Sequence, residues 1–491
     1  MHNLLMRHAP QAYAYKSQSV AFCNSLIFVQ WTIHLYRKLE QACDIYVIYN
    51  LILCLAAKKR GDIVKSAVVK TESTTYMILY DYNIVADVNG LDALTIQNFK
   101  EYIKNNYNRT LCDKNIIDGI IDGHYYGINL CLIPSNICNL RCQYCYSKSG
   151  TINTNDIIDA DNVKMAIDTV FNNYRKFSSY YKKPINILFH GGGEPTCNWD
   201  GLRKIVEYTR EQQLKYGIRV ILKLLTNGIL SNKCSLWVGS TFDEVVFSID
   251  GMPEINDIMR PFPDGTPSTM IAMNAASIVS KLTNVGVHSV VSNESKGKGE
   301  AVTKYFLHEI PDIKYLHYER YRTTRQGRNN AFYLSNKDFI DFVFDSIKIG
   351  GDLVKSSIID TNIKRYYCRS CNGNMIYCFP NNMVSLCNEH DDGMFVIGNY
   401  IGGINISKEH YLKNREYLKE LHENMKCESC FAFPFCRGGC RSFYMQCDDY
   451  KKEWCEMFID AIIRLFEYKF SNMSSESVNM CNQSVKYIKL N

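Results

Sequence analysis

Hydrophobic residues form short runs between residues 128 and 320, and amphipathic stretches separate these runs. The runs are rich in Val, Ile, Leu and aromatic residues, which is typical of strands buried on both faces of a parallel sheet. They cover Ile128–Ile133, Ile185–His190, Val220–Thr226, Asp243–Asp250, Val287–Ser292 and Ile313–Arg320. After the first run, apolar residues from Val163 to Phe171 repeat at helical spacing. Six strand-then-helix units predict an α/β domain with parallel strands.

Outside this region the pattern is less regular and suggests further units. A hairpin is predicted over Ala67–Tyr82 and a helix over Ile96–Asn106, whereas the tail after Phe470 is polar and predicted to fray. We expect these units: 1–62, unassigned; 63–127, a small N-terminal domain and candidate for peptide binding; 128–330, the α/β domain; 331–365, a linker with a helix; 366–460, a Cys-rich domain organised by metal; 461–491, a C-terminal helix and tail.

Composition places the chain among ordinary globular proteins. Its 491 residues allow roughly three domains. Hydrophobic residues make up 46 % and charged residues 22 %, which excludes disorder or collagen as the dominant state. The formal charge of +6 is too small to predict a nucleic-acid partner.

Membrane insertion and secretion are not expected. Polar residues interrupt the apolar stretch Val20–Tyr36, and Asp44–Ala57 is shorter than the about 20 residues that a membrane span needs, so both are predicted to be buried helices. No signal-peptide pattern is found at the start. A cytoplasmic location is predicted.

Cysteine is the unusual residue of this composition. There are 21, of which eleven lie between Cys368 and Cys481. A disulfide scaffold would be short and secreted. Metal or cluster ligation in a reducing cytosol is therefore favoured over disulfides.

The first chemical motif is Cys138-Asn-Leu-Arg-Cys142-Gln-Tyr-Cys145, directly after the first predicted strand. Three thiolates in one tight loop can hold a 4Fe–4S cluster and leave one iron without a protein ligand, whereas most electron-transfer clusters have four cysteines. A zinc knuckle, the alternative, needs a fourth ligand, and none is near in sequence.

Three further motifs stand at the carboxyl ends of the next strands, where α/β domains carry their chemistry. They are His190-Gly-Gly-Gly-Glu194-Pro195, Thr226-Asn-Gly228 and Ser248-Ile-Asp250-Gly251, the last followed by Arg260. Consecutive glycines let a backbone pass close to a ligand or adopt positive φ. The alternative for Asn227-Gly228 is a plain turn.

These motifs resemble, in order and spacing, those of the radical SAM enzymes. The resemblance implies a partial (β/α)6 TIM-like barrel in which Cys138, Cys142 and Cys145 bind a 4Fe–4S cluster whose open iron binds S-adenosylmethionine. It implies that Tyr144 lies near the adenine, and that Gly192, Gly193 and Glu194 contact the methionine amino group. Ser248 and Arg260 would contact the ribose or carboxylate.

The C-terminal cysteines resemble the SPASM extension of radical SAM peptide maturases. Cys427, Cys430, Cys436 and Cys440 are spaced C-x2-C-x5-C-x3-C. The upstream half departs from the family pattern, since Asn382 stands where that family has Gly; Asn tolerates left-handed φ, so the turn is expected to be kept. The resemblance implies two auxiliary 4Fe–4S clusters with these ligands: Cys368, Cys371, Cys387 and Cys440 for one; Cys427, Cys430, Cys436 and Cys455 for the other. Cys378 could replace Cys368 or Cys371, and Cys447 could replace Cys455. Two all-cysteine zinc sites are the alternative.

The resemblance implies reductive cleavage of S-adenosylmethionine and hydrogen abstraction from a peptide or protein, with electrons from a ferredoxin or flavodoxin-type reductant. A maturase that installs a crosslink, thioether or epimer on a ribosomal peptide is preferred to an anaerobic sulfatase maturase, because Asn388 stands where the sulfatase enzymes have a base Asp. Glu389 and Asp250 are candidate catalytic residues. Residues 63–127 could bind a leader peptide by strand addition. The alternatives are a small-molecule radical SAM enzyme, and a multi-cluster electron carrier or zinc scaffold.

Overall fold

A computed structural model describes much of residues 66–490. The described part omits 72, 108–118, 122–123, 148–155, 179–182, 323–329, 363–366, 369, 371–372, 389–394, 415, 417–426, 428–429, 441, 443–449, 473–474 and 481–482. The two apolar stretches before residue 58 therefore lie outside the described residues. Among the described helices, none has the length and apolar character needed to cross a membrane.

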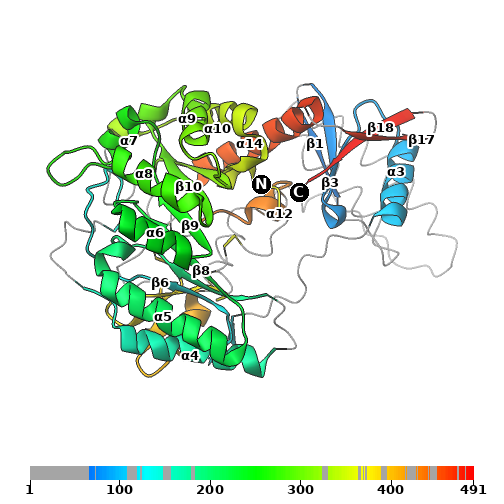
Figure 1. The fold of residues 1–491 in the computed structure, drawn as a ribbon. Helices are drawn as coiled ribbons and strands as arrows, with labels where there is room; N and C mark the ends of the chain where they lie inside the picture. Colours follow the sequence, from blue (N-terminus) through cyan, green and yellow to red (C-terminus); the bar gives the residue numbers. More distant parts are fainter. Residues whose placement is uncertain are drawn as a thin grey trace, which may run out of the picture. The chain divides into compact units, whose positions relative to one another are not determined.

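A largely parallel sheet forms the centre of the fold, as the runs of hydrophobic residues predicted (Figure 1). All six predicted strands are present: β6 (Asn129–Leu132), β7 (Ile185–Phe189), β8 (Val220–Thr226), β9 (Glu244–Ser248), β10 (Asn284–Val291) and β11 (Tyr315–Arg320). They lie side by side in chain order, each parallel to the next. The α/β fold with a partial barrel is thus confirmed.

Two short strands that the sequence did not reveal extend this parallel array. β12 (Val354–Lys355) pairs with β11, and β13 (Ile376–Cys378) pairs with β6 at the other end. Antiparallel strands β14 (Met383–Ser385), β15 (Val396–Asn399) and β16 (Asn405–Ile406) continue the sheet beyond β13. The cysteine-rich region therefore begins as part of the barrel sheet.

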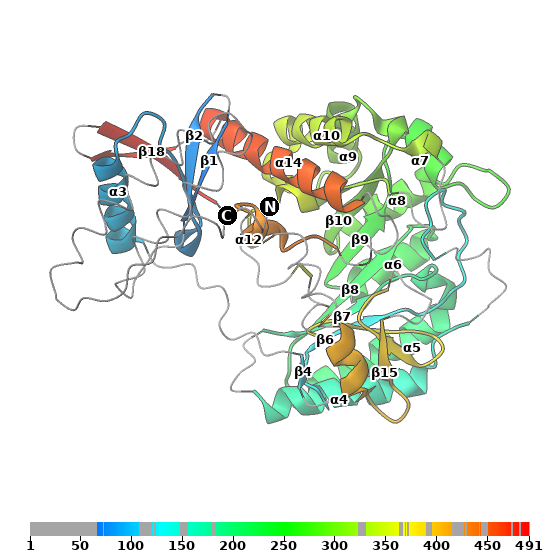
Figure 2. The same ribbon diagram turned by 180° about the vertical axis from the view of Figure 1, so that it is seen from behind.

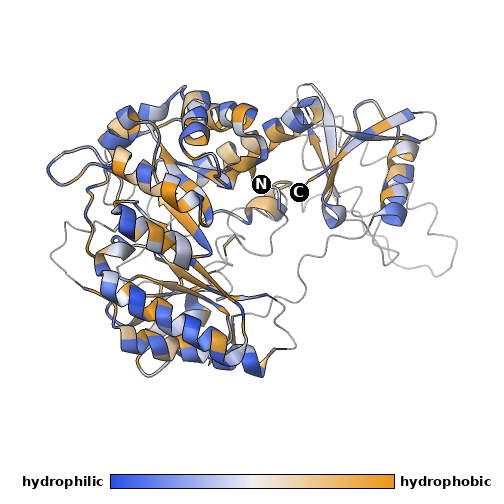
Figure 3. Cartoon of the chain, in the orientation of Figure 1, coloured by the Kyte–Doolittle hydropathy of each residue, from blue (hydrophilic) through white to orange (hydrophobic). Residues whose placement is uncertain are grey.

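Helices alternate with the strands, and many cover the sheet (Figures 1 and 2). They are α4 (Ala160–Lys176), α5 (Trp199–Tyr216), α6 (Asn232–Thr241), α7 (Pro253–Met259), α8 (Thr269–Ser280), α9 (Gly299–Glu309) and α10 (Asn336–Gly350). The face predicted from Val163 to Phe171 is buried in α4, and Asp159 caps the N-terminus of that helix. Figure 3 shows the strands as mainly hydrophobic and the helices as two-faced.

Further helices lie in the cysteine-rich region and its C-terminal continuation. α12 (Phe433–Cys436) is a single turn, and α14 (Tyr450–Asn472) carries Cys455 and the buried Trp454. Asn382 has φ +63°, so the left-handed conformation expected at this position is confirmed.

A second sheet of five strands contains both the N-terminal piece and the C-terminal tail. Its order is β1 (Ser66–Lys70), β2 (Thr75–Leu79), β3 (Ile84–Asp87), β18 (Gln483–Lys489) and β17 (Glu476–Met480). The predicted hairpin is confirmed as β1–β2, and the predicted helix as α3 (Ala93–Asn106). A further short hairpin joins β4 (Ile120–Ile121) to β5 (His124–Tyr125).

The prediction that the tail frays is wrong. β17 and β18 pair with each other, and β18 pairs with β3. Val485 and Tyr487 alternate with polar residues along β18 and pack with Phe99 in a second apolar core. This period of two is a strand signal that the overall polarity of the tail concealed.

Candidate active site

A cavity of about 460 Å³ opens at the carboxyl ends of the parallel strands. Every residue predicted to hold the first cluster or S-adenosylmethionine lines it: Cys138, Cys142, Tyr144, Cys145, Gly192, Gly193, Glu194, Ser248 and Arg260. Asp250 is fully buried and is not part of its lining. Glu389 lies outside the described residues. Segments spread over more than 120 residues therefore meet in one place.

The cysteine loop is fixed by the backbone that follows α7. The Arg141 amide donates to the Pro261 carbonyl at 2.8 Å, and the Gln143 amide donates to the Met259 carbonyl at 2.9 Å. The Arg141 guanidinium also donates to the Cys138 carbonyl at 3.0 Å. These bonds shape the loop without using its thiols.

The three thiols are partly buried, and neither they nor any other described cysteine of the chain is in a disulfide. Burial raises the pKa of Cys142 to about 12, so this thiol ionises only in exchange for a bound cation. A loop with three thiols, none of them in a disulfide, is suited to metal rather than to redox exchange.

The glycine-rich loop passes very close to the cysteine loop. The Gly193 amide donates to Ser135 and the Glu194 amide to Ile137, both at 2.8 Å. A Cβ on Gly193 would lie 2.1 Å from the Ile137 carbonyl oxygen, while Gly192 and Gly193 have no positive φ. The glycines are thus required for close approach rather than for left-handed backbone.

Glu194 is buried and held by several donors. Its Oε1 accepts from the Thr226 hydroxyl at 2.8 Å and from the Thr196 hydroxyl at 2.8 Å, and its Oε2 accepts from the Asn227 amide at 2.7 Å. Burial raises the pKa of Glu194, although these hydrogen bonds oppose the shift. A carboxylate fixed in this way is suited to receive an ammonium group.

The Thr226-Asn-Gly228 motif is more than a turn. The Asn227 side-chain amide donates to Asn139 at 2.7 Å and lies 4.0 Å from the Cys138 sulfur, so this motif contacts the cysteine loop. Gly228 has φ +78°, and a Cβ there would lie 2.9 Å from the Phe247 ring. Both backbone conformation and space therefore require glycine at this position.

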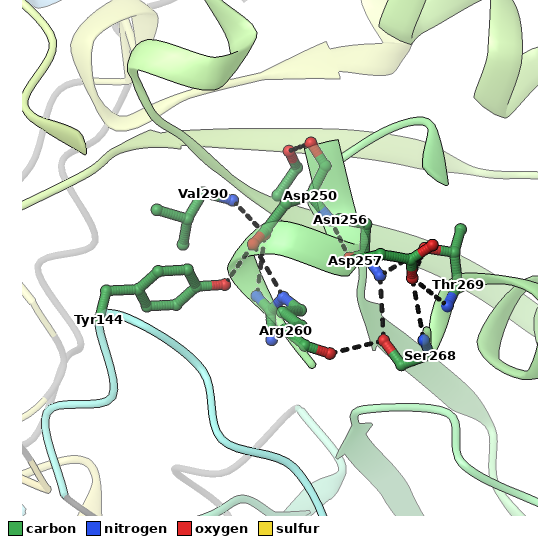
Figure 4. Close-up of polar contacts among 9 residues, drawn as sticks. Tyr144, Asp250, Asn256, Asp257, Arg260, Ser268, Thr269 and Val290 are labelled. Carbon is green, nitrogen blue, oxygen red and sulfur yellow. Dashed lines mark hydrogen bonds and ion pairs between the residues drawn. The ribbon is translucent and has the colours of Figure 1, made fainter. Parts of the chain in front are cut away.

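Asp250 is the centre of a buried polar cluster (Figure 4). Its carboxylate accepts from the Tyr144 hydroxyl at 2.6 Å and the Val290 amide at 2.9 Å, and forms an ion pair with Arg260 at 3.0 Å. The Arg260 guanidinium also lies 5.1 Å from the centre of the Tyr144 ring. Burial alone would lower the pKa of Arg260, but Asp250 raises it above its ordinary value. The cluster thus orients two residues predicted to contact S-adenosylmethionine.

Sequence reasoning missed a second polar group in the cavity, on β10 and β11. His317 shares a hydrogen bond of 2.8 Å with Glu319, and Arg322 forms an ion pair with Glu319 at 3.0 Å. The His288 ring packs edge-on against His317 with centroids 4.9 Å apart. Burial would raise the pKa of Glu319, but the bond with His317 and the Arg322 charge hold it well below its usual range. The polar residues Tyr315, His317 and Glu319 alternate with buried residues along β11, which was an available signal.

The donor set fits a 4Fe–4S cluster with bound S-adenosylmethionine. Three free thiols, a buried carboxylate and a loop without side chains line one cavity. Within the described residues, no three Cys, His, Asp or Glu side chains converge as they would around a single metal ion. In a cubic cluster each cysteine binds a different iron, so its ligands are spread apart.

The C-terminal cysteines gather around Cys436. Burial raises the pKa of Cys436 to about 12, and the nearby thiols of Cys430, Cys455 and Cys427 raise it further. The three other ligands predicted for one auxiliary cluster are thus near enough to Cys436 to affect it electrostatically. Cys447, the alternative to Cys455, lies outside the described residues.

The other predicted auxiliary set is only partly described, since Cys371 lies outside the described residues. The Tyr377 side chain on β13 lies near both Cys368 and Cys387. Cys378 is the next residue of that strand, is fully buried in the apolar core, and so faces away from Tyr377.

Comparison with known proteins shows what this part of the chain is similar to. The model of the Radical SAM superfamily matches residues 132–289. A solved structure of native anSMEcpe with bound AdoMet aligns with a TM-score of 0.56 and 20 % identity, over 70 % of this chain and 99 % of that chain. The aligned structure shares the fold of this chain, and the cysteine loop and the glycine-rich loop lie within the residues that the family model matches.

Curated relatives define the group more narrowly. An uncharacterized protein of Methanocaldococcus jannaschii is 34 % identical over 36 % of this chain and 58 % of its own length. The radical SAM cyclopropyl synthase TigE of Paramaledivibacter caminithermalis is 25 % identical over 63 % of this chain and 66 % of its own length. A cysteine-type anaerobic sulfatase-maturating enzyme of Clostridium perfringens is 23 % identical over 70 % of this chain and 97 % of its own length. The chain is thus similar to radical SAM proteins over part of its length, and it spans less than two thirds of the first two relatives.

Proposed function

We propose that this chain is a radical SAM maturase that modifies a residue of a ribosomally made peptide. The observation that carries the proposal is the meeting of the three thiols, the glycine-rich loop and Glu194 in one cavity. A reduced 4Fe–4S cluster and S-adenosylmethionine, when bound, would supply a 5′-deoxyadenosyl radical that abstracts hydrogen from the peptide. The modification proposed is a crosslink, a thioether or an epimer.

In this proposal Cys138, Cys142 and Cys145 hold the cluster. The Glu194 carboxylate and the backbone of Gly192 and Gly193 receive the methionine end of S-adenosylmethionine. Ser248 and Tyr144 face the adenosine. Asp250 is given a positioning role, because its oxygens are engaged by Tyr144, Arg260 and Val290.

The auxiliary cysteines are proposed to bind two further 4Fe–4S clusters that accept an electron from the substrate radical. One set is Cys427, Cys430, Cys436 and Cys455; the other is Cys368, Cys371, Cys387 and Cys440. The proximity of Cys427, Cys430 and Cys455 to Cys436 supports the first set. A ferredoxin or flavodoxin-type partner would reduce the cluster of the cysteine loop.

A crosslink also requires that a proton leave the substrate. Asn388 lines the cavity, but its amide cannot accept a proton as a carboxylate does. His317 is the proposed acceptor, because Glu319 orients its ring and both line the same cavity. A peptide leader could add to the second sheet at β1 or β17, its outer strands, since β18 already pairs with β3.

Two experiments test the function. Anaerobic reconstitution with S-adenosylmethionine and a reductant should yield 5′-deoxyadenosine. Absence of both this product and bound iron would contradict the proposed enzymatic activity. Co-expression with short peptides encoded beside the gene, followed by mass spectrometry, should reveal a mass change. An unchanged mass of every such peptide counts against peptide maturation.

A sulfatase-maturating activity is the second candidate, because a relative of that name aligns over 97 % of its length. The presence of Asn388 in the cavity argues against it. Incubating the reduced enzyme with a cysteine-containing sulfatase peptide decides between the two. Formylglycine in that peptide would establish the second candidate.

A further inference from the structure

A chain of hydrogen bonds connects the cysteine-rich region to the glycine-rich loop. The Asn388 side-chain amide donates to the Tyr146 hydroxyl oxygen at 3.0 Å. The Tyr146 hydroxyl in turn donates to the Gly191 carbonyl at 2.6 Å. Asn388 directly follows Cys387, and Tyr146 directly follows Cys145. The chain therefore links two predicted cluster ligands to the loop proposed to bind S-adenosylmethionine.

The loop depends on such external contacts for its orientation. Gly191, Gly192 and Gly193 have no side chains, so contacts of their own backbone must oppose the high entropy of glycine. The Gly191 carbonyl also accepts from His190 at 2.9 Å, and the Gly192 carbonyl accepts from the Ser147 hydroxyl. Residues just after Cys145 thus hold two successive carbonyls of the loop.

The direction of the bonds explains why an amide is useful at position 388. Because Asn388 donates to the Tyr146 oxygen, the single hydroxyl hydrogen of Tyr146 is left to point at Gly191. Donation to a hydroxyl also strengthens the bond that the hydroxyl donates. An aspartate at 388 would instead accept the Tyr146 hydrogen and compete with Gly191 for it.

We infer that Asn388 and Tyr146 are positioning residues that fix the glycine-rich loop for S-adenosylmethionine. The Asn388 side chain cannot act as a base. It instead affects the reaction by holding the loop proposed to bind S-adenosylmethionine. The inference rests on the proposed role of this loop in binding S-adenosylmethionine, and it does not depend on which substrate is modified.

The test measures S-adenosylmethionine binding and cleavage by the reconstituted full chain without a peptide. Affinity is read from the change in the EPR spectrum of the reduced cluster on titration with S-adenosylmethionine, and cleavage from 5′-deoxyadenosine. Tyr146→Phe and Asn388→Asp should each weaken affinity about 5- to 10-fold, the loss expected for one hydrogen bond, and change kcat less than about twofold. In the Tyr146→Phe background, Asn388→Asp should have no further effect, because the two residues act in series.

Tyr400→Phe is the matched control. It removes a hydroxyl-to-carbonyl bond of the same kind, from Tyr400 to Phe379, away from the cavity lining. Glu194→Ala reports separately on the proposed site. If Glu194→Ala weakens affinity but Tyr146→Phe and Asn388→Asp match the wild type, the inference is overturned and the proposed site stands. If Glu194→Ala has no effect, both are overturned.

Discussion

The cysteine loop and the C-terminal cysteines differ in what surrounds their sulfur atoms. Cys138, Cys142 and Cys145 line a cavity that they share with polar groups from several strand ends. Cys436 belongs to the main apolar core, and Cys430 and Cys440 pack against that core. The first arrangement leaves room for a ligand beside the thiols, whereas the second places Cys436, Cys430 and Cys440 in or against the apolar core.

This difference matches the two uses of thiolate ligation. A cluster with three protein ligands keeps one iron open to a small molecule. The glycine-rich loop and Glu194 line the same cavity as the three thiols. A cluster with four ligands is closed and can transfer electrons without binding anything. We therefore expect loss of a ligand to have different consequences in the two regions.

Cys142→Ala should produce the largest effect. Loss of one of three ligands should remove the first cluster and lower 5′-deoxyadenosine formation by more than about 1,000-fold, because no radical can form. Iron should fall by about four per chain. Cys234→Ala, on the surface helix α6, is the control and should retain both. Undiminished cleavage in Cys142→Ala would refute the assignment of the cysteine loop.

Cys436→Ala should separate the two regions. It should also lower iron by about four per chain, but keep 5′-deoxyadenosine formation within about threefold of wild type, since the cofactor site remains. Peptide modification in the co-expression assay should be lost. If cleavage falls as far as in Cys142→Ala, the two regions are not independent and the comparison fails.

The sequence predicted the cavity better than its surroundings. Cys138, Glu194 and Ser248 follow strands with strong hydrophobic runs, so the rule that chemistry sits at strand ends brought them together. The strands β12 and β13 were missed because two or three residues carry too little pattern, and their existence depends on pairing with β11 and β6.

The contacts of Asn388 and His317 were also beyond sequence reasoning. Asn388 reaches Tyr146 across 242 positions of the chain, and nothing local to either residue specifies the partner. His317 and Glu319 lie within a predicted strand. Because that strand was interpreted as buried on both faces, the alternation of polar and buried residues along it was overlooked. Motifs that repeat within a family were thus readable, whereas contacts particular to this chain required the structure.

Asp250→Asn tests how much the buried cluster of Asp250, Arg260 and Tyr144 contributes to the stability of the fold. The change leaves the Arg260 guanidinium buried without its ion-pair partner, so we expect a loss of about 3–5 kcal/mol in the free energy of unfolding. Thermal unfolding followed by circular dichroism measures it. Asp168→Asn, which removes the charge from an acceptor of the Tyr208 hydroxyl, should cost about 1 kcal/mol or less. Equal losses in the free energy of unfolding of the two variants would show that the buried cluster around Asp250 stabilises the fold no more than the bond between Asp168 and Tyr208 does.

Cys378→Val should have the smallest effect and sharpens the ligand assignment of the cysteine-rich region. Cys378 is fully buried in β13 and faces away from Tyr377, which lies near Cys368 and Cys387. Valine has a similar volume and fits a strand, so the free energy of unfolding should change by less than about 1.5 kcal/mol. Iron should stay at about twelve per chain, the content of three 4Fe–4S clusters, whereas Cys368→Ala should lower it by about four. The opposite result, with iron lost in Cys378→Val and kept in Cys368→Ala, would make Cys378 the ligand and would require β13 to turn its other face toward the cluster.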